Sequence, residues 1–65
     1  MNIQEIKAAV ISGKKVFSDS EMYSVIYSEK TQKWFIVCAV NGYTIGLTHG
    51  DGVTLNGDPE GFFIG

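Results

Sequence analysis

This sequence has no arginine, one cysteine, one histidine and one proline, and it has no long apolar run. Seven acidic residues outnumber its five lysines, which argues against a protein that relies on contacts with a phosphate backbone. Cys38 has no second cysteine for an internal disulfide, and with only His49 beside it there is no zinc-binding set, so we expect neither metal nor cofactor. No segment approaches the roughly 18 apolar residues of a membrane span, and the basic-then-apolar pattern of a signal segment is missing. These absences predict a protein of the reducing cytoplasm that makes no membrane contact.

The length of the chain limits its stability. Sixty-five residues, 45% of them hydrophobic, predict one globular domain over residues 1–65. A chain of about 60 residues buries only about 60% of the surface that it exposes when unfolded. Without a disulfide or a metal, such a chain depends on dense packing or on a partner. We therefore expect a homo-oligomer, most simply a dimer.

The N-terminal segment has the pattern of a helix over residues 3–12. Asn2 and Glu5 have the spacing of a capping box, and Gly13 is a natural stop after the last turn. The helix would present one apolar stripe to a sheet. That stripe consists of Ile3, Ile6, Ala9 and Val10.

The middle of the chain predicts a three-strand antiparallel meander. A four-residue connection over residues 29–32 would pair Val25 with Ile36. The dipeptide Asn41-Gly42, a strong signal for a two-residue hairpin turn, would then pair Ile36 with Leu47. Short extra strands are expected over residues 15–18 and within residues 53–64. The predicted fold class is α+β, with one N-terminal helix packed on a small antiparallel β-sheet.

The two faces of the predicted sheet differ less in hydrophobicity than the faces of a half-buried sheet usually do. Both hairpins place the same apolar residues on one face, which the helix would cover. The opposite face is also partly apolar, so it is either a self-association or partner surface, or it is covered by the C-terminal segment of the same chain. The candidate interface residues are Met22, Ile26, Phe35, Val37, Phe62 and Phe63.

A glycine-rich stretch over residues 46–54 is the main candidate for a ligand site. Backbone amides of such loops bind phosphates in other proteins, but no P-loop lysine, dinucleotide-binding spacing or following helix is present. Two interpretations therefore stay open: the glycines serve tight turns, or the loop contacts an anionic ligand together with two lysines of the helix end. The candidate ligand-binding residues are Lys14, Lys15, Thr48, His49, Asp51 and Thr54.

Catalysis and nucleic-acid binding have weak support. His49 and Asp51 could form an oriented base, but no serine or cysteine nucleophile is placed beside them, and Cys38 is expected to be buried and inert. The aromatic residues of the strands lack the lysines and arginines that surround base-stacking platforms. We therefore expect a protein that is not an enzyme and does not bind nucleic acid.

Four segments carry a family resemblance: IKAAV at residues 6–10, GK at 13–14, NGYTIGLT at 41–48 and DGVTLNG at 51–57. They resemble the small accessory proteins of bacteriophages and prophages. The resemblance implies an inhibitor of bacterial host defence in the host cytoplasm, which acts by sequestering a small nucleotide-like anion at an oligomer interface or by docking on a host protein. The alternatives are a structural or assembly module without a ligand and, last, a minimal enzyme using His49 and Asp51.

Overall fold

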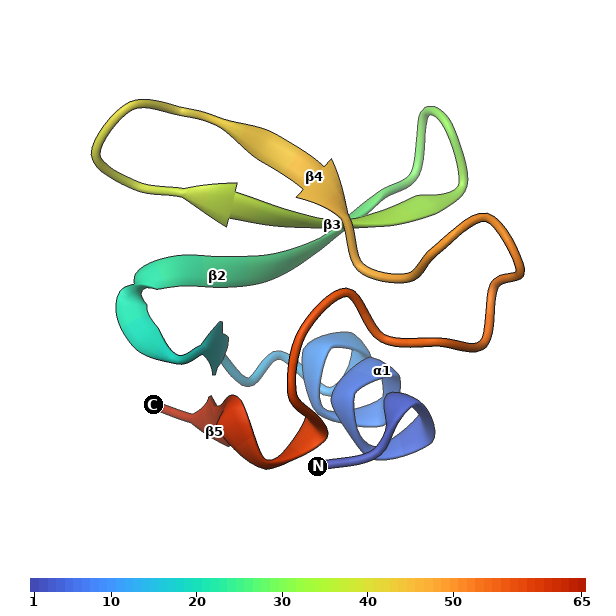
Figure 1. Ribbon diagram of the computed structural model, residues 1–65, viewed down its shortest axis with the longest axis horizontal. Coiled ribbons are helices and arrows are strands. Elements are labelled where there is room, and N and C mark those ends of the chain that lie inside the picture. Colours follow the sequence, from blue (N-terminus) through green and yellow to red (C-terminus); the bar gives the residue numbers. More distant parts are fainter.

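The chain folds into one helix and a five-stranded sheet in a computed structural model that describes residues 1–65 (Figure 1). The order of elements along the chain is α1 (Ile3–Ile11), β1 (Val16–Ser18), β2 (Ser20–Ser28), β3 (Lys33–Cys38), β4 (Thr44–Gly46), the 3₁₀ turn η1 (Pro59–Gly61) and β5 (Phe62–Ile64). Every pair of neighbouring strands is antiparallel. The predicted α+β class and the N-terminal helix are confirmed.

Both ends of α1 follow from local sequence. The side chain of Asn2 accepts the backbone N–H of Glu5 at 2.8 Å, and the Glu5 carboxylate accepts the backbone N–H of Asn2 at 3.0 Å, so the capping box is complete. At the other end the N–H of Gly13 donates to Val10 and the N–H of Lys14 donates to Ala9. This pair of hydrogen bonds requires a residue in the left-handed conformation directly after the helix. Gly13 is that residue, with φ of +92°.

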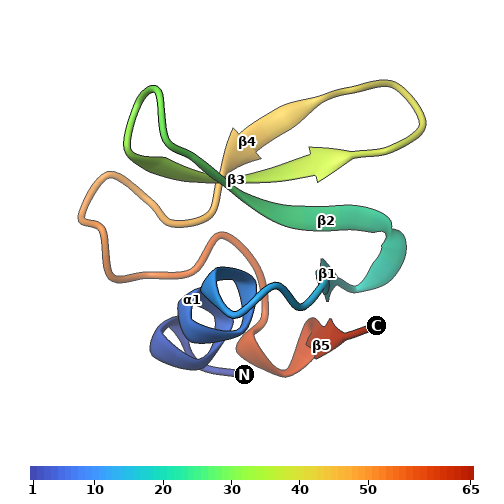
Figure 2. The same ribbon diagram turned by 180° about the vertical axis from the view of Figure 1, so that it is seen from behind.

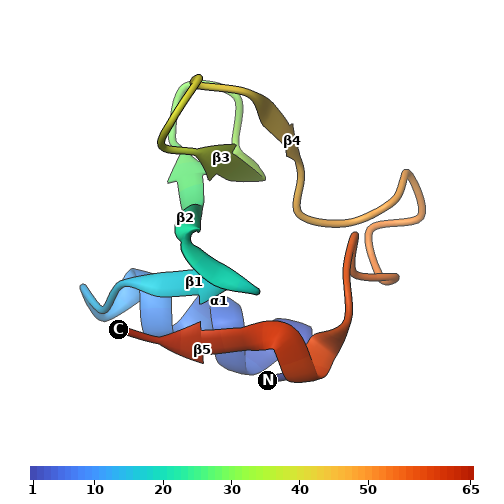
Figure 3. The same ribbon diagram turned by 60° about the vertical axis from the view of Figure 1, so that its left-hand side comes forward.

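The sheet has the strand order β4-β3-β2-β1-β5, so the last strand lies beside the first. The predicted short strands at both ends of the chain are therefore present as β1 and β5. Figures 1 and 2 show α1 beside β1 and β5, at the end of the sheet away from β4. In Figure 3, β3 and β4 lie across the molecule from β1 and β5, with β2 connecting the two halves.

The register of the first hairpin is as predicted, but that of the second is not. Val25 pairs with Ile36 in the β2–β3 ladder. In the β3–β4 ladder, however, Ile36 pairs with Ile45 and not with Leu47. The prediction of a two-residue Asn41-Gly42 turn is wrong, because the connection from Cys38 to Tyr43 contains four residues.

Local hydrogen bonds explain the longer connection. A two-residue turn of the predicted type needs positive φ at both central residues, and only Gly42 has it, at +71°. The Asn41 side chain instead accepts the N–H of Tyr43 at 2.9 Å, while the N–H of Gly42 donates to the carbonyl of Cys38 at 2.8 Å. The resulting shift is two residues, which leaves each side chain on its predicted face.

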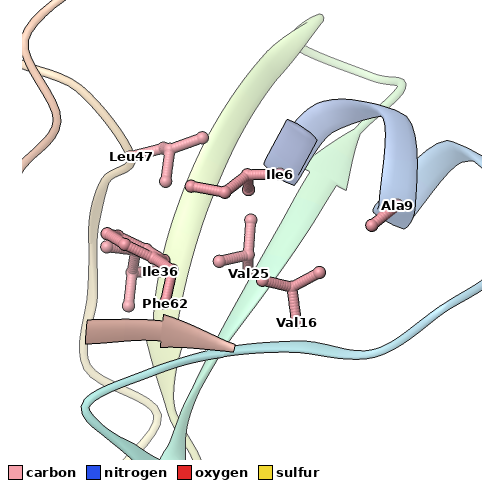
Figure 4. Close-up of a cluster of buried hydrophobic side chains, with 7 residues drawn as sticks. All are labelled: Ile6, Ala9, Val16, Val25, Ile36, Leu47 and Phe62. Atoms are coloured by element: carbon pink, nitrogen blue, oxygen red, sulfur yellow. The ribbon is translucent and has the colours of Figure 1, made fainter. Parts of the chain in front are cut away.

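One apolar cluster joins the helix to every part of the sheet. Figure 4 shows its side chains converging from α1, from the strands and from the segment after β4. Ile6, Val16 and Leu47 have no exposed surface at all. The seven members are Ile6, Ala9, Val16, Val25, Ile36, Leu47 and Phe62.

The other face of the sheet keeps an apolar surface, and the C-terminal segment does not fold across it. Met22 and Ile26 are exposed there, while Phe35 and Val37 are half-buried. Phe62 points into the core and is 3% exposed, so its predicted place on an interface is a misassignment. Phe63 alternates to the outer face, where its ring lies 5.5 Å from that of Phe17. The segment extends the sheet as β5. Successive side chains of a strand point to opposite faces, so Phe62 reaches the core and Phe63 reaches the outer face.

Candidate functional site

A hollow of about 440 Å³ opens where α1, the start of β3, the end of β4 and the glycine-rich loop meet. We call it the Trp34 hollow. It contains two of the five lysines of the chain and none of its seven acidic residues. Its lining consists of Lys7, Lys33, Trp34, Phe35, Gly46, Thr48, His49, Gly50 and Gly52.

The wall of this hollow combines a cation with an aromatic surface. The Nζ atom of Lys7 lies 5.6 Å from the centre of the Trp34 ring, within the range of a cation–π contact. Trp34 also packs on Tyr27, with ring centroids 4.8 Å apart. Trp34 is half-buried, and Lys7 follows the fully buried Ile6 on α1. Core packing therefore fixes the Trp34 ring and the backbone from which Lys7 extends.

The loop over residues 49–54 forms the opposite wall and is held by its own hydrogen bonds. The N–H of His49 donates to the carbonyl of Thr54 at 2.8 Å, and the N–H of Gly52 donates to the carbonyl of His49 at 3.0 Å. Gly52 has φ of +73°, a conformation that favours glycine. Gly50 belongs to the lining of the hollow, and its N–H donates to no atom of the chain.

Asp51 is the residue that ties this loop together. Its Oδ1 accepts the N–H groups of Val53 and Thr54 at 2.9 and 3.0 Å, and its Oδ2 accepts the hydroxyl of Thr54 at 2.7 Å. The backbone N–H of Thr54 first, then that of Val53 and the Thr54 hydroxyl, lower the pKa of Asp51 from 3.8 to about 2. The carboxylate is thus engaged by its own loop and does not orient His49.

This lowered pKa makes the loop sensitive to acid. Because the folded-state pKa lies below the ordinary value, ionised Asp51 stabilises the fold fully above about pH 4, and this contribution is lost as the pH falls through about 2. We expect Asp51→Asn to lower the melting temperature at neutral pH, with a difference from the original protein that shrinks below pH 3.8. NMR titration of the Asp51 carboxyl carbon measures the midpoint directly. A midpoint at the ordinary value would contradict the hydrogen-bonded loop.

The structure divides the six predicted ligand residues among three places. Thr48 and His49 line the Trp34 hollow. Asp51 and Thr54 stabilise the loop instead of facing that hollow. Lys14 and Lys15 line a separate groove of about 360 Å³ beside Phe17, Glu21 and Ile26.

Three lining residues were missed by sequence reasoning: Lys7, Lys33 and Trp34. A signal for Trp34 existed, because the hairpin pattern places it near the strand end that leads to His49. Lys7 had the weaker signal of a cation next to the apolar helix stripe. Nothing in the sequence alone places the helix against the loop.

The predicted interface residues lie on the outer face of the sheet, apart from Phe62. Ile26 is 41% exposed and Met22 is 45% exposed. Phe35 borders the Trp34 hollow, and Ile26 borders the groove near Lys14. The outer face therefore lies between the two concave regions, and its apolar side chains alternate with polar ones such as Ser24 and Thr44.

Comparison with protein-family models, with curated proteins and with solved structures found no match to this chain. The single α-helix has nine residues, and no helix has the length and apolar character needed to cross a membrane. No three His, Cys, Asp or Glu side chains come together as a metal-binding group. The site therefore has to be interpreted from its own geometry.

Proposed function

We propose that this protein binds a small nucleotide-like anion in the Trp34 hollow and acts by sequestering it. The observation that carries this proposal is a local excess of positive charge. Lys7 and Lys33 line a hollow without a carboxylate, in a chain whose formal net charge is −2. Cations gathered at a concave, partly apolar surface attract an anion more strongly than the same cations on an open surface. The ligand is therefore expected to be negatively charged.

The aromatic wall favours a ligand with a planar ring. Lys7 lies over the Trp34 ring, so a base that stacks there would displace the Lys7 ammonium from the ring toward the phosphate of the same ligand. The Gly50 N–H and the Thr48 hydroxyl add polar groups at the other wall. The volume of about 440 Å³ falls within the range of roughly 300–1,000 Å³ of small-molecule sites.

The same geometry favours binding without catalysis. Asp51 is engaged by Val53 and Thr54, so His49 has no carboxylate partner. Cys38 is 5% exposed and does not line the hollow. The lining does contain the Thr48 hydroxyl and His49, but no hydrogen bond pairs this hydroxyl with the imidazole, as activation of a nucleophile by a base requires. We therefore propose a protein that holds its ligand and leaves it chemically unchanged.

The biological setting is proposed from the resemblance to small bacteriophage and prophage proteins. A phage-encoded protein in the host cytoplasm that withholds a nucleotide signal would block a host defence that depends on that signal. A chain of 65 residues is sufficient for this role, because sequestration needs one tight site and no chemistry.

A panel of mononucleotides, dinucleotides and unphosphorylated nucleosides tests the proposal. We expect at least one phosphorylated compound to raise the melting temperature and to bind with one molecule per chain in titration calorimetry, and the matching nucleoside to bind far more weakly. Lys7→Gln should weaken binding by about tenfold or more, since a hydrogen bond to a charged group contributes about 1.5–3 kcal/mol. Mass spectrometry of the recovered ligand should show it unchanged.

Lys14→Gln is the matched control, because it removes the same charge from the same side chain outside the hollow. We expect Lys14→Gln to bind like the original protein, and Trp34→Leu to bind more weakly because it removes the stacking surface. Equal losses in Lys7→Gln and Lys14→Gln would refute the site. No binding across the panel would refute the function.

The second candidate function is docking on a host protein through the outer face of the sheet. Met22 and Ile26 favour it because they are exposed apolar side chains on a face that no other element covers. It becomes the leading function if the original protein blocks host defence while the nucleotide panel shows no binding.

A further inference from the structure

The two edges of the sheet are not equally protected. At the β4 edge the side chain of Asn56 donates to the carbonyl of Gly46 at 3.3 Å, and the glycine-rich loop continues from the strand. At the other edge β5 has a neighbouring strand on one side only, as Figures 1 and 3 show. Natural sheets guard free edges by keeping the edge strand very short or with charges, prolines or bulges. β5 is short, with three residues, but residues 61–65 carry no charged side chain, proline or bulge.

The direction of the free backbone groups on β5 follows from its pairing with β1. The N–H of Asp19 donates to Gly61 and the N–H of Gly65 donates to Lys15. Because an antiparallel strand alternates its hydrogen-bonding direction, Phe63 also faces β1, while Phe62 and Ile64 turn their backbone groups outward. The N–H of Phe62 donates to Pro59 in η1. The groups left for a partner are the carbonyl of Phe62 and both groups of Ile64.

We propose that β5 pairs with β5 of a second copy, antiparallel about a two-fold axis at Phe63. In this register the outward N–H of Ile64 in each copy meets the outward carbonyl of Phe62 in the other. Phe63 then lies opposite Phe63 at a non-hydrogen-bonded position, where cross-strand side chains are closest. Phe17 and Phe63, with rings 5.5 Å apart in one copy, would then form a cluster of four aromatic rings with the same two residues of the second copy.

A second copy fits this edge because the edge complements itself. Donor meets acceptor at two symmetric places, and an isologous interface requires this match. The contact also covers Phe63 and Ile64, which are 37% and 47% exposed in one copy. The Trp34 hollow contains no residue of β5, so each copy keeps a complete hollow and the dimer does not depend on the proposed ligand.

The contact is small compared with interfaces of about 800 Å² per partner, so we expect a weak dimer that forms as concentration rises. Sedimentation equilibrium of the full chain should show a mass that moves from 7.1 kDa toward twice this value between low micromolar and millimolar protein. Over the same range the amide of Ile64 should become protected from hydrogen exchange. A monomer at all concentrations would overturn the proposal.

Ile64→Pro is the sharpest variant, because proline removes the outward N–H, which no bond to β1 uses. We expect it to weaken dimerisation at least tenfold and to stay folded. Ile64→Ala removes the side chain but keeps the N–H, so it should dimerise more tightly than Ile64→Pro. Ile11→Lys, at a 75% exposed apolar position on α1, should dimerise like the original protein. Equal dimerisation of Ile64→Pro and the original protein, or loss of the dimer in Ile11→Lys, would overturn the proposal.

Discussion

Replacing Phe62 by alanine is expected to lower the free energy of unfolding by about 3–5 kcal/mol, the usual cost of removing a buried phenylalanine. Phe62 is 3% exposed and belongs to the same cluster as Ile6 and Val16. A domain of this length has a total stability on the order of 3–10 kcal/mol. The substitution should therefore remove a large fraction of the total stability, and urea denaturation followed by Trp34 fluorescence should show a much lower midpoint.

The neighbouring Phe63→Ala is the matched control. Phe63 is the same residue type in the same strand, but it is 37% exposed and its aromatic contact is with Phe17 on the outer face. Loss of one aromatic pair costs about 0.5–1.5 kcal/mol. Similar losses in the two variants would mean that β5 does not alternate between the core and the outer face as described.

Replacing Ile6 by alanine is expected to cost about 2–5 kcal/mol, because it opens a cavity under α1. Ile6 has no exposed surface and is the largest contribution of the helix to the core. Since Lys7 follows it, loosening this contact should also weaken nucleotide binding at temperatures where the variant is still folded. Differential scanning calorimetry with and without ligand measures both effects.

Ile11→Ala provides the comparison on the same helix. Ile11 is 75% exposed at the last position of α1, so its removal opens no cavity. Exposed substitutions of this kind usually change stability by less than about 0.5 kcal/mol. A large loss in Ile11→Ala, or a small one in Ile6→Ala, would show that the helix packs through a different face.

Much of this fold is predictable because its local and long-range signals agree. Asn2 and Glu5 define the helix start, and Gly13 defines its end, through bonds that involve only nearby residues. The β2–β3 register follows from a four-residue connection and from alternation over long strands. Agreement of this kind across levels is what makes a sequence specify a structure.

The β3–β4 connection was mispredicted because two local interactions compete there. Asn41-Gly42 favours a two-residue turn. The Asn41 side chain, however, accepts a hydrogen bond from the N–H of Tyr43, which stabilises the four-residue connection instead. The periodicity of the strands does not separate the two outcomes, because registers that differ by two residues bury the same face. A pattern with period two therefore fixes the face and leaves the pairing open.

The candidate site is less predictable than the fold. The loop residues Thr48 and His49 stood out because glycines surround them, whereas Lys7 resembled an ordinary solvated helix residue. The two lysines nearest the helix end, Lys14 and Lys15, face a different groove. Which lysine meets the loop depends on how the helix lies on the sheet, and this geometry is set by packing of the core.

The Trp34 hollow is built from three segments that are far apart in sequence: α1, the start of β3 and the glycine-rich loop. A ligand that touches all three binds only the folded chain and so draws the equilibrium toward it. At a ligand concentration one hundred times its dissociation constant, this linkage adds about 2.7 kcal/mol to the free energy of unfolding. For a chain without a disulfide, such a ligand would act as a reversible cross-link, and the amount of folded protein in the cell would follow the supply of the compound that it captures.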